Sequence, residues 1–321
     1  MKSEELNLKA ICAEFDVDVE IEPYGNGHIN DTYICEYTPR YILQRLNTNV
    51  FKNPEAVMEN ILNVTRHLAE KIRACGGNPQ RETLNVVMTR DGKCIYKADD
   101  ENYFRMYKFI EDSVSYDMVE NPVQLYHAGK AFGKFQSMLD DFPADKLHET
   151  ITDFHNTPVR VSQLEQAIEN DAAKRVKLAG KEIEFAKEYT KYASAITDKM
   201  ADGSVLLRVT HNDTKLNNVL FDKDTDEGLC VIDLDTVMPG SVLFDFGDAL
   251  RFGASSGSED EQDLDKIWFD LEKFEQFAKG FLSETADCLT QTEIELLPLS
   301  ALIMTYECGT RFLADYLNGD T

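Results

Sequence analysis

Short apolar runs separated by turn residues dominate the first third of the chain and predict a β-rich region. The strands that this pattern predicts number about five and cover residues 32–37, 41–46, 84–89, 93–96 and 103–110. Residues 21–24 lead into a glycine loop at 25–27, and a plausible hairpin turn at 38–40 lies between the first two predicted strands. Asp91-Gly92, a dipeptide typical of tight hairpins, joins the third and fourth predicted strands.

One long helix interrupts these strands. Asn53 suits its N-cap and Pro54 its first helical position. Apolar residues then recur at helical spacing, at Val57, Ile61, Val64, Leu68 and Ile72. The run Gly76-Gly77-Asn78-Pro79 predicts where the helix ends.

The remaining two thirds of the chain follow a mostly helical pattern. Helices are predicted at 123–139, within 160–200, at 264–282 and at 292–317, and two short apolar runs at 218–221 and 229–232 interrupt them. A β-rich part followed by a helix-rich part predicts an α+β fold of two lobes. We place the N-terminal lobe at 1–110 and the helical C-terminal lobe at 111–321.

Composition narrows the classes of partner. The 321-residue chain is 43% hydrophobic and carries a formal net charge of −25. The apolar share is enough for a sizeable core. Nucleic acids and anionic membranes bind basic patches, so the acidic balance predicts neither as a partner. The sequence leaves the oligomeric state open.

The cysteines and the N-terminus indicate a cytoplasmic protein. Seven cysteines, an odd number without a CxxC pair, argue against a zinc ribbon or a disulfide framework. The first 15 residues are charged and lack the apolar core of a signal peptide. No run of 18 apolar residues predicts a membrane span.

The candidate chemistry lies in residues 211–218, which fit the pattern H-x-D-x-x-x-x-N, and in Asp233, fifteen residues later. Asp213 can accept the hydrogen bond of an attacking hydroxyl, and the amide oxygen of Asn218 can reach a metal ion. Asp233, after an apolar strand, can bind Mg²⁺ that bridges phosphates. A loop rich in Asp and Asn can also be a simple turn, but the downstream carboxylate and the upstream glycine loop favour transfer of the γ-phosphate of ATP to a hydroxyl.

These segments resemble the aminoglycoside phosphotransferase and choline kinase family, relatives of the protein kinases. Within that family, THNDTKLNNVLFD (210–222), VIDLDTVMPGSVLFDFGDALRFGA (231–254) and YGNGHINDTY (24–33) are most similar to the hexosamine kinases. The similarity continues through YILQRLN (41–47), DFHNTP (153–158) and ECGTRFLADYL (307–317), so it spans nearly the whole chain. It implies a two-lobed protein-kinase-like fold with ATP in the cleft between the lobes.

The resemblance also implies roles for individual residues. Asp213 would be the catalytic base, Asn218 and Asp233 would hold Mg²⁺, and Asp245 would brace the catalytic loop. Asp235 could bind a metal ion or a sugar hydroxyl. The residues expected at the nucleotide are Gly25, Asn26, Gly27, Asn30, Thr32, Gln44, Tyr107, Phe109 and Ile110. Those expected at the sugar are His28, Asp213, Asp235 and Arg311, with His155 and Arg160 as further candidates for shaping the pocket.

Two departures from the wider group stand out. Protein kinases place a lysine in the strand after the glycine loop, whereas this chain has Gln44 there, so the cation that meets the phosphates is left open. Glu59, or else Glu55, on the following helix is the candidate ion-pair partner of such a cation. In the family a helical segment with a sugar-site tyrosine continues beyond Thr321, so either the chain is truncated or its acceptor site is completed differently.

The expected reaction is phosphorylation of an N-acetylhexosamine, GlcNAc or GalNAc, at its anomeric hydroxyl. A kinase of the same fold that acts on choline, homoserine or an aminoglycoside remains an alternative. A non-catalytic nucleotide-binding relative is disfavoured by the intact set of Asp213, Asn218 and Asp233. A protein kinase is disfavoured by the missing strand lysine and the missing A-P-E segment.

Overall fold

The computed structural model describes residues 7–18, 20–25, 29–35, 38–119, 121–257 and 261–320. The chain divides into two compact units. Unit 1 comprises Met1–Val114, Lys146–Ile151 and Leu220–Met238, and unit 2 comprises Ser115–Asp145, Thr152–Val219 and Pro239–Thr321. Unit 1 holds most of the strands and unit 2 most of the helices, which confirms the predicted α+β class.

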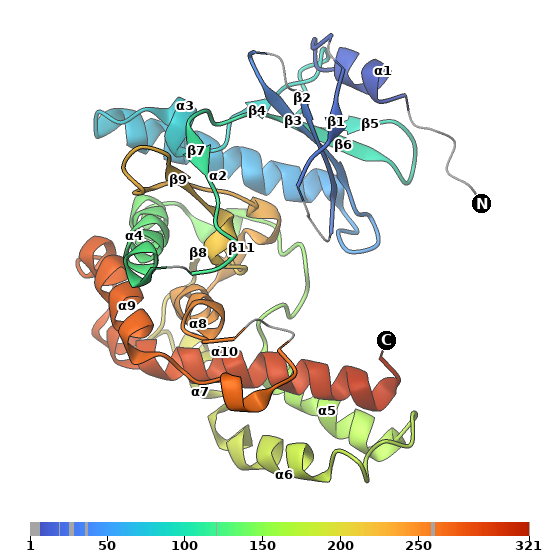
Figure 1. Ribbon diagram of the computed structural model, residues 1–321, viewed down its shortest axis with the longest axis vertical. Helices are drawn as coiled ribbons and strands as arrows, with labels where there is room; N and C mark the ends of the chain where they lie inside the picture. Colours follow the sequence, from blue (N-terminus) through green and yellow to red (C-terminus); the bar gives the residue numbers. More distant parts are fainter. Residues whose placement is uncertain are drawn as a thin grey trace. The chain divides into compact units, whose positions relative to one another are not determined.

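Unit 1 is built on a six-stranded antiparallel sheet in the order β1–β2–β3–β6–β4, with β5 also paired to β6 (Figure 1). The strands are β1 (Glu22–Pro23), β2 (Asp31–Cys35), β3 (Tyr41–Leu46), β4 (Val86–Val87), β5 (Tyr96–Lys97) and β6 (Tyr103–Lys108). Five of the six residues of β6 are buried, because Phe104 and Met106 pack with Ile11 and Cys12 on one face of the sheet and Arg105 lies against Met58 on the other.

The predicted hairpin around Asp91-Gly92 needs a correction. The turn itself forms, since Gly92 has a φ of +78° and the Thr89 amide donates to the Lys93 carbonyl at 2.8 Å. The flanking strands are shorter than predicted, and each pairs with β6 and not with the other. The long, buried β6 offers both of them hydrogen-bond partners, which a local pattern cannot reveal.

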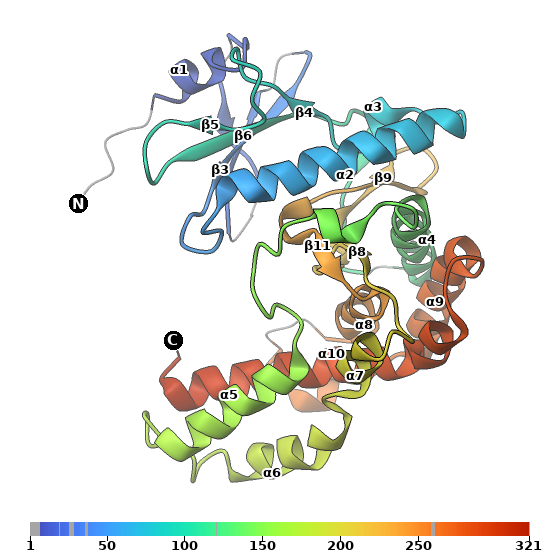
Figure 2. The same cartoon turned by 180° about the vertical axis from the view of Figure 1, so that it is seen from behind.

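Helix α2 (Pro54–Ala74) runs beside this sheet (Figures 1 and 2). The Asn53 side chain caps it by accepting from the Ala56 amide at 3.1 Å. The predicted stripe is buried throughout, at Val57, Ile61, Val64, Leu68 and Ile72. A short helix that the pattern did not predict, α1 (Leu8–Ala13), adds Ile11 and Cys12 to the core formed with β3 and β6.

Buried Asn60 ties two distant segments to α2. Its side-chain amide donates to the carbonyls of His148 at 2.8 Å and Val237 at 2.9 Å, and its oxygen accepts from the His148 amide at 2.8 Å. The other elements of unit 1 are α3 (Pro79–Glu82), β7 (Ser113–Val114), β10 (Gly228–Val231) and the 3₁₀ turn η4 (Leu234–Thr236). Strand β9 (Val219–Asp222) pairs with β7 and β10, which sets the position of Asp233 just after β10.

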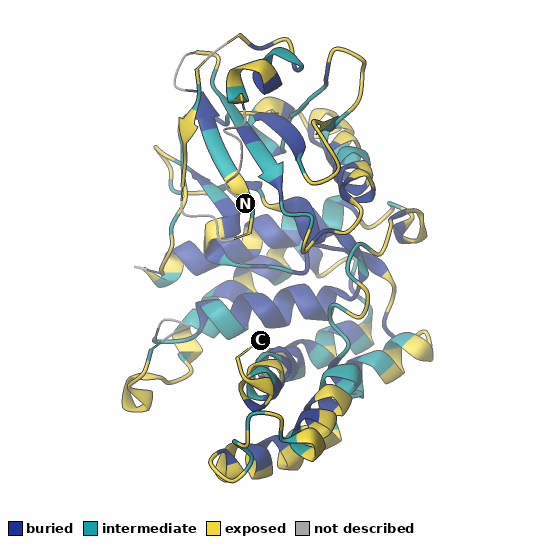
Figure 3. Cartoon of the chain, turned by 90° about the vertical axis from the view of Figure 1, so that its right-hand side faces the viewer, coloured by how far each residue is buried: buried dark blue, intermediate teal, exposed yellow. Residues whose placement is uncertain are grey.

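Unit 2 is mostly helical. Its helices are α4 (Pro122–Met138), α5 (Thr157–Asn170), α6 (Gly180–Tyr189), α7 (Ala195–Ala201), α8 (Val242–Gly253), α9 (Leu271–Thr285) and α10 (Gln291–Asn318). Strands β8 (Arg208–Thr210) and β11 (Met238–Gly240) form a small ribbon beside them. The outer helices carry one buried and one exposed face (Figure 3). No helix of the described ranges is long and apolar enough to cross a bilayer.

Helix α8 was not predicted. Ten of its twelve residues are buried, so it lacks the alternation of apolar and polar faces that marks a surface helix. Glycine allows the close approach of its neighbour α10, because a Cβ at Gly247 would lie 2.5 Å from the Ser300 carbonyl oxygen. This packing fixes the helix that carries Asp245 and Asp248.

Candidate functional site

The segment predicted to be the catalytic loop, residues 211–218, follows β8 and is anchored by one buried carboxylate; we keep the name catalytic loop for it below. Asp245, in the first turn of α8, accepts from the His211 amide at 2.9 Å and the Asn212 amide at 2.7 Å. The side-chain amide of Gln136 on α4 donates to the same carboxylate at 2.6 Å. Asp245 is 1% exposed, and burial raises the pKa of its carboxyl although these donors oppose the shift. These hydrogen bonds allow Asp245 to brace the loop, which is the role that the resemblance implies for it.

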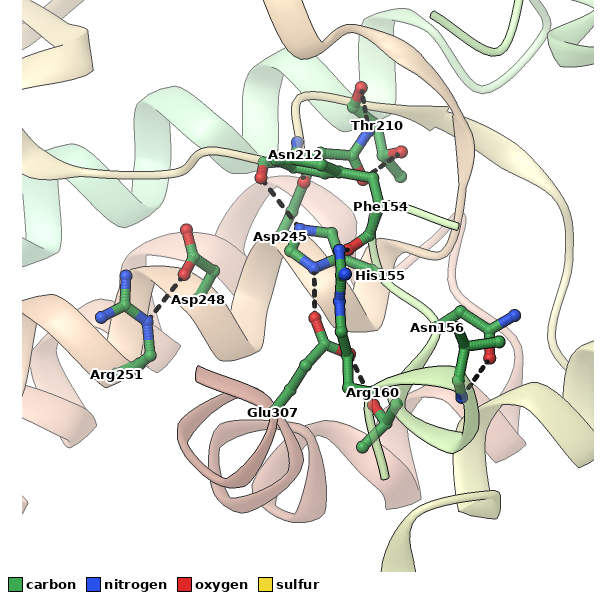
Figure 4. Close-up of polar contacts among 12 residues, drawn as sticks. Phe154, His155, Asn156, Arg160, Thr210, Asn212, Asp245, Asp248, Arg251 and Glu307 are labelled. Atoms are coloured by element: carbon green, nitrogen blue, oxygen red, sulfur yellow. Dashed lines mark hydrogen bonds and ion pairs between the residues drawn. The ribbon is translucent and has the colours of Figure 1, made fainter. Parts of the chain in front are cut away.

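A second carboxylate on α8 holds the next turn of the loop. Asp248 accepts from the Thr214 amide at 3.1 Å and from Arg251 Nε at 2.9 Å (Figure 4). The Thr214 hydroxyl donates to the Asp245 carbonyl at 2.6 Å. Both ends of the segment that contains Asp213 are therefore hydrogen-bonded to one buried helix.

Asp213 itself has few contacts. Its side chain is 26% exposed and lies 2.9 Å from Lys215 Nζ. Asn218 Nδ2 donates to the Asp213 carbonyl at 2.8 Å and is 3.3 Å from Asp213 Oδ2. A carboxylate with solvent access is suited to accept a hydrogen bond from a hydroxyl group. The neighbouring Lys215 ammonium group favours an anionic phosphate nearby.

His211 is a structural member of the loop. Its ring is fully buried, with centroids 5.7 Å from Phe132 and 6.1 Å from Phe135 in edge-to-face geometry. Its Nδ1 atom accepts from the Asp213 amide at 3.3 Å. The histidine of the motif thus packs against α4 and leaves Asp213 as the exposed acid of the pattern.

Unit 1 gathers several of the residues predicted to bind the nucleotide around a buried guanidinium. Arg105 on β6 is 1% exposed, forms an ion pair with Asp235, and donates from Nε to Gln44 Oε1 at 2.9 Å. Gln44 in turn donates to Thr32 Oγ1 at 3.0 Å, and Asn30 Nδ2 donates to Asp235 Oδ2 at 2.6 Å. We call these five residues the Arg105 cluster.

The Arg105 cluster places a buried positive charge beside Gln44, the residue that stands where protein kinases have a lysine. Gln44 on β3 and Arg105 on β6 face each other in the sheet register. Burial disfavours the charge of Arg105, but Asp235 outweighs it and raises the pKa of the guanidinium above its ordinary value. Gln44 and Arg105 are neighbours because β3 pairs with β6, and the sequence alone does not show this strand pairing. Asp235 is 4% exposed, and both of its oxygens accept hydrogen bonds within unit 1, so its role toward substrate stays a prediction.

Glu59 does not pair with a cation near Gln44. Its carboxylate lies 2.8 Å from His148 Nε2, and both side chains are about half exposed or more. Glu59, the candidate ion-pair partner of the cation left open by the sequence, thus contacts His148, whereas the buried guanidinium of Arg105 pairs with Asp235.

The other predicted residues are placed as follows. Gly25 has a φ of +72°, whereas Asn26, Gly27 and His28 lie outside the described residues.

Tyr107 is buried beside Arg105, and burial raises the pKa of its phenol. Phe109 donates its amide to the Arg40 carbonyl at 3.0 Å, with the Arg40 guanidinium 3.9 Å above its ring, and Ile110 is buried.

Asp233 is exposed and has a left-handed backbone, with φ 57° and ψ 57°. Such a conformation is strained for a residue with a Cβ and clusters at functional sites. With its amide nitrogen donating to Asp213, Asn218 keeps its amide oxygen as an acceptor. Carboxylate and amide oxygens are both ligands that Mg²⁺ takes in proteins, so each of the two residues keeps the chemistry predicted for it. The described residues contain no cluster of three or more His, Cys, Asp or Glu that could hold a metal alone.

Arg311 is exposed on α10, with its guanidinium carbon 5.3 Å from the Phe312 ring centroid. Arg160 on α5 donates to Gln163 and to the Phe154 carbonyl. His155 contacts the catalytic loop directly, at 2.9 Å from the Asn212 carbonyl. Of the residues suggested for the acceptor pocket, His155 thus reaches the loop that carries Asp213.

Comparison with known proteins matches residues 20–277 to the model of the APH phosphotransferase enzyme family. The chain belongs to this family. The match includes the glycine loop, the catalytic loop and Asp233, and it ends within α9. The loop at 211–218 and the carboxylate after β10 therefore lie within the part of the chain that matches the family.

Solved structures share the fold at low sequence identity. An amicoumacin kinase in complex with AMP-PNP, Ca²⁺ and Ami aligns with a TM-score of 0.66 and 14% identity, over 99% of this chain and 88% of that one. A microcompartment-associated aminopropanol kinase aligns at 0.58 and 16%, over 98% and 97% of the two chains. A spectinomycin phosphotransferase bound to ADP and spectinomycin aligns at 0.59 and 13%, over 99% and 87%. These likenesses support the protein-kinase-like fold.

Proposed function

We propose that this chain transfers the γ-phosphate of ATP to the anomeric hydroxyl of an N-acetylhexosamine. The observation that carries phosphotransfer is the loop in which Asp213 stays accessible while Asp245 and Asp248 hold the backbone on either side. Membership of the phosphotransferase family and the nucleotides named for the structural relatives support ATP as the donor.

Asp213 would accept the hydrogen bond of the sugar hydroxyl and orient its oxygen toward the γ-phosphorus. The new O–P bond forms as the bond from phosphorus to the bridging oxygen of ADP breaks, and the hydroxyl proton passes to the Asp213 carboxylate. Lys215, 2.9 Å from Asp213, would offset negative charge on the transferring group. Positioning and charge compensation supply most of the catalysis in reactions of this kind.

Asn218 and Asp233 would hold the Mg²⁺ that accompanies ATP. When bound, the ion neutralises charge on the phosphates. The protein's part is to present two oxygen ligands: Asn218 by directing its nitrogen to the Asp213 carbonyl, and Asp233 by its left-handed backbone after β10. In unit 1, the Arg105 cluster would keep Gln44 and Thr32 in fixed orientations for contact with the nucleotide.

The acceptor is assigned from sequence. The segments 24–33, 210–222 and 231–254 resemble the hexosamine kinases, and Arg311 is exposed on α10, where its rigid donors suit sugar hydroxyls. An amino alcohol or an antibiotic is the second candidate, favoured by the substrates named for the relatives of similar fold.

ADP release against a panel of acceptors tests the proposal. The panel contains GlcNAc, GalNAc, choline, homoserine, aminopropanol and an aminoglycoside, and ³¹P NMR locates the new phosphate. We expect turnover with an N-acetylhexosamine and a 1-phosphate product. A 6-phosphate product, or turnover only with amines, overturns the sugar assignment. If no acceptor of the panel gives ADP release, transfer of phosphate to these classes of small molecule is overturned.

A further inference from the structure

His155 makes contact with the catalytic loop from outside it. The residue lies in the segment before α5, and its side chain is 11% exposed. Nε2 lies 2.9 Å from the Asn212 carbonyl oxygen, and Nδ1 lies 2.8 Å from Glu307 Oε1 on α10. Figure 4 shows the ring between these two acceptors. The imidazole thus connects α10 to the residue immediately before Asp213.

The ring has little freedom to turn. Its centroid lies 4.7 Å from that of Phe154 and 5.3 Å from that of Phe244. The second oxygen of Glu307 accepts from the buried Thr157 hydroxyl at 2.6 Å, so the carboxylate is fixed as well. Two aromatic rings and two polar contacts hold His155 in one orientation.

The contact falls on a strained peptide. Asn212 has a φ of +65°, a left-handed conformation that side chains disfavour. Its amide donates to Asp245 Oδ1 at 2.7 Å, and its carbonyl meets His155. Since the peptide that joins Asn212 to Asp213 is held through this carbonyl, its orientation decides where the Asp213 carboxylate points.

We propose that His155 and Glu307 form a positioning pair that fixes the direction of Asp213 by donating an N–H to the Asn212 carbonyl. Neither residue touches the reacting atoms. This inference rests on the proposed phosphotransfer at Asp213 and adds a second brace, opposite the one that Asp245 provides from α8.

The two contacts determine the protonation of the pair. A carbonyl and a carboxylate are both acceptors, and a neutral imidazole has only one N–H to offer. Both hydrogen bonds are therefore complete when His155 carries a proton on each nitrogen. The charged groups around it are Glu307 from α10, Asp248 and Asp245 from α8 with Arg251 on Asp248, and Arg160 from α5.

The balance of these groups favours the protonated ring. Burial lowers the pKa of His155, but the hydrogen bond and charge of Glu307, together with Asp248 and the Asn212 carbonyl, raise it above the ordinary value. The contribution of the pair is therefore fully present below the ordinary histidine pKa of 6.5 and lost as pH rises through the raised pKa. Above it, one of the two hydrogen bonds is missing and Asp213 loses its fixed direction.

Paired variants separate positioning from folding. His155→Ala removes the donor, and we expect kcat to fall about tenfold to a hundredfold with an unchanged KM for ATP, because misplacing a catalytic group by an ångström has effects of this size. Glu307→Gln can donate an amide hydrogen to Nδ1 of a neutral ring, which leaves Nε2–H for Asn212. This variant should keep most of the kcat at neutral pH and lose the fall at alkaline pH.

The matched control is His148→Ala. His148 has the same 2.8 Å contact with a carboxylate, that of Glu59, but it is exposed, and both residues belong to unit 1. Its removal should leave kcat and its pH profile unchanged. A kcat for His155→Ala equal to that of the wild type, or an alkaline limb retained unshifted in Glu307→Gln, overturns the proposal.

NMR of protein labelled with ¹⁵N-histidine gives a readout that does not depend on activity. The proposal expects His155, assigned with the His155→Ala variant, to show protons on both ring nitrogens at about pH 6, below the ordinary histidine pKa, and one proton in Glu307→Gln. A neutral His155 ring in the wild type contradicts the pair. If the wild type has no kinase activity while the ring is doubly protonated, the proposed function fails and the pair stands.

Discussion

The catalytic loop of unit 2 and the Arg105 cluster of unit 1 are both organised by a buried aspartate, but the partners differ. Asp245 accepts mainly from backbone amides, those of His211 and Asn212. Asp235 accepts from two side chains, Arg105 and Asn30. Backbone donors are present whatever the sequence, whereas the Arg105 cluster depends on each of its members. We therefore expect the two regions to respond differently to substitution.

The largest effect is expected in the Arg105 cluster. Arg105→Met leaves the buried Asp235 carboxylate without its counter-charge, which should lower the free energy of unfolding by about 3–5 kcal/mol. Urea unfolding measures the change. Adding Asp235→Leu removes the unpaired charge and should recover most of the loss.

Arg45→Met is the control, because Arg45 pairs with Asp31 on the exposed side of the same sheet and should cost under about 1 kcal/mol. A single Arg105→Met variant as stable as Arg45→Met would mean that the cluster does not hold unit 1 together.

A smaller loss of stability is expected in the loop. Asp245→Asn keeps the shape but turns one acceptor into a donor that faces a backbone N–H, which should cost about 1–3 kcal/mol. Turnover should fall more than this stability change implies, since the loop before Asp213 loses an anchor. Thermal unfolding and ADP release, measured beside Asp198→Asn on the exposed surface of α7, check both points. Full activity in Asp245→Asn would make the brace dispensable.

The smallest effect concerns a third buried carboxylate, Glu293, which combines both kinds of partner. It accepts from Arg208 Nε at 2.9 Å and from the Thr290 amide at 2.8 Å. Burial opposes its charge, but these donors outweigh burial and lower the pKa of Glu293 below 4.5. Its contribution to stability is then present above pH 4.5 and lost as pH falls toward the lowered pKa.

Unfolding free energies measured between neutral and acid pH should therefore decline less steeply in Glu293→Gln than in the wild type. An unchanged slope would show that Glu293 has the same pKa in the folded and unfolded chain.

Local features of the sequence predicted the parts of the fold that depend on local periodicity. Helix α2 could be predicted because its apolar stripe repeats at helical spacing, and its cap is set by Asn53. Helix α8 could not, because it is buried on all sides. The motif and its spacing supplied Asp213, and family resemblance supplied the bracing role of Asp245. Lys215, two residues after Asp213 in the same loop, was visible in the motif but was not assigned a role.

Contacts between distant positions account for what the sequence left open. Arg105 lies 130 positions from Asp235, and His155 lies 152 positions from Glu307. Neither pair has a spacing that a pattern could reveal, since each depends on how strands and helices pack. The ion pair of Arg105 with Asp235 and the contact of His155 with Asn212 therefore emerged only from the folded chain.

The turnover of Asp213→Asn tests the central claim most directly. The substitution preserves volume and removes the proton acceptor, so we predict a fall in ADP release with an N-acetylhexosamine of about 10²–10⁴-fold. ATP affinity, measured by calorimetry on the same sample, should stay close to that of the wild type. Turnover within a few-fold of the wild type, with ATP still bound, would contradict the assignment of Asp213 as the catalytic base.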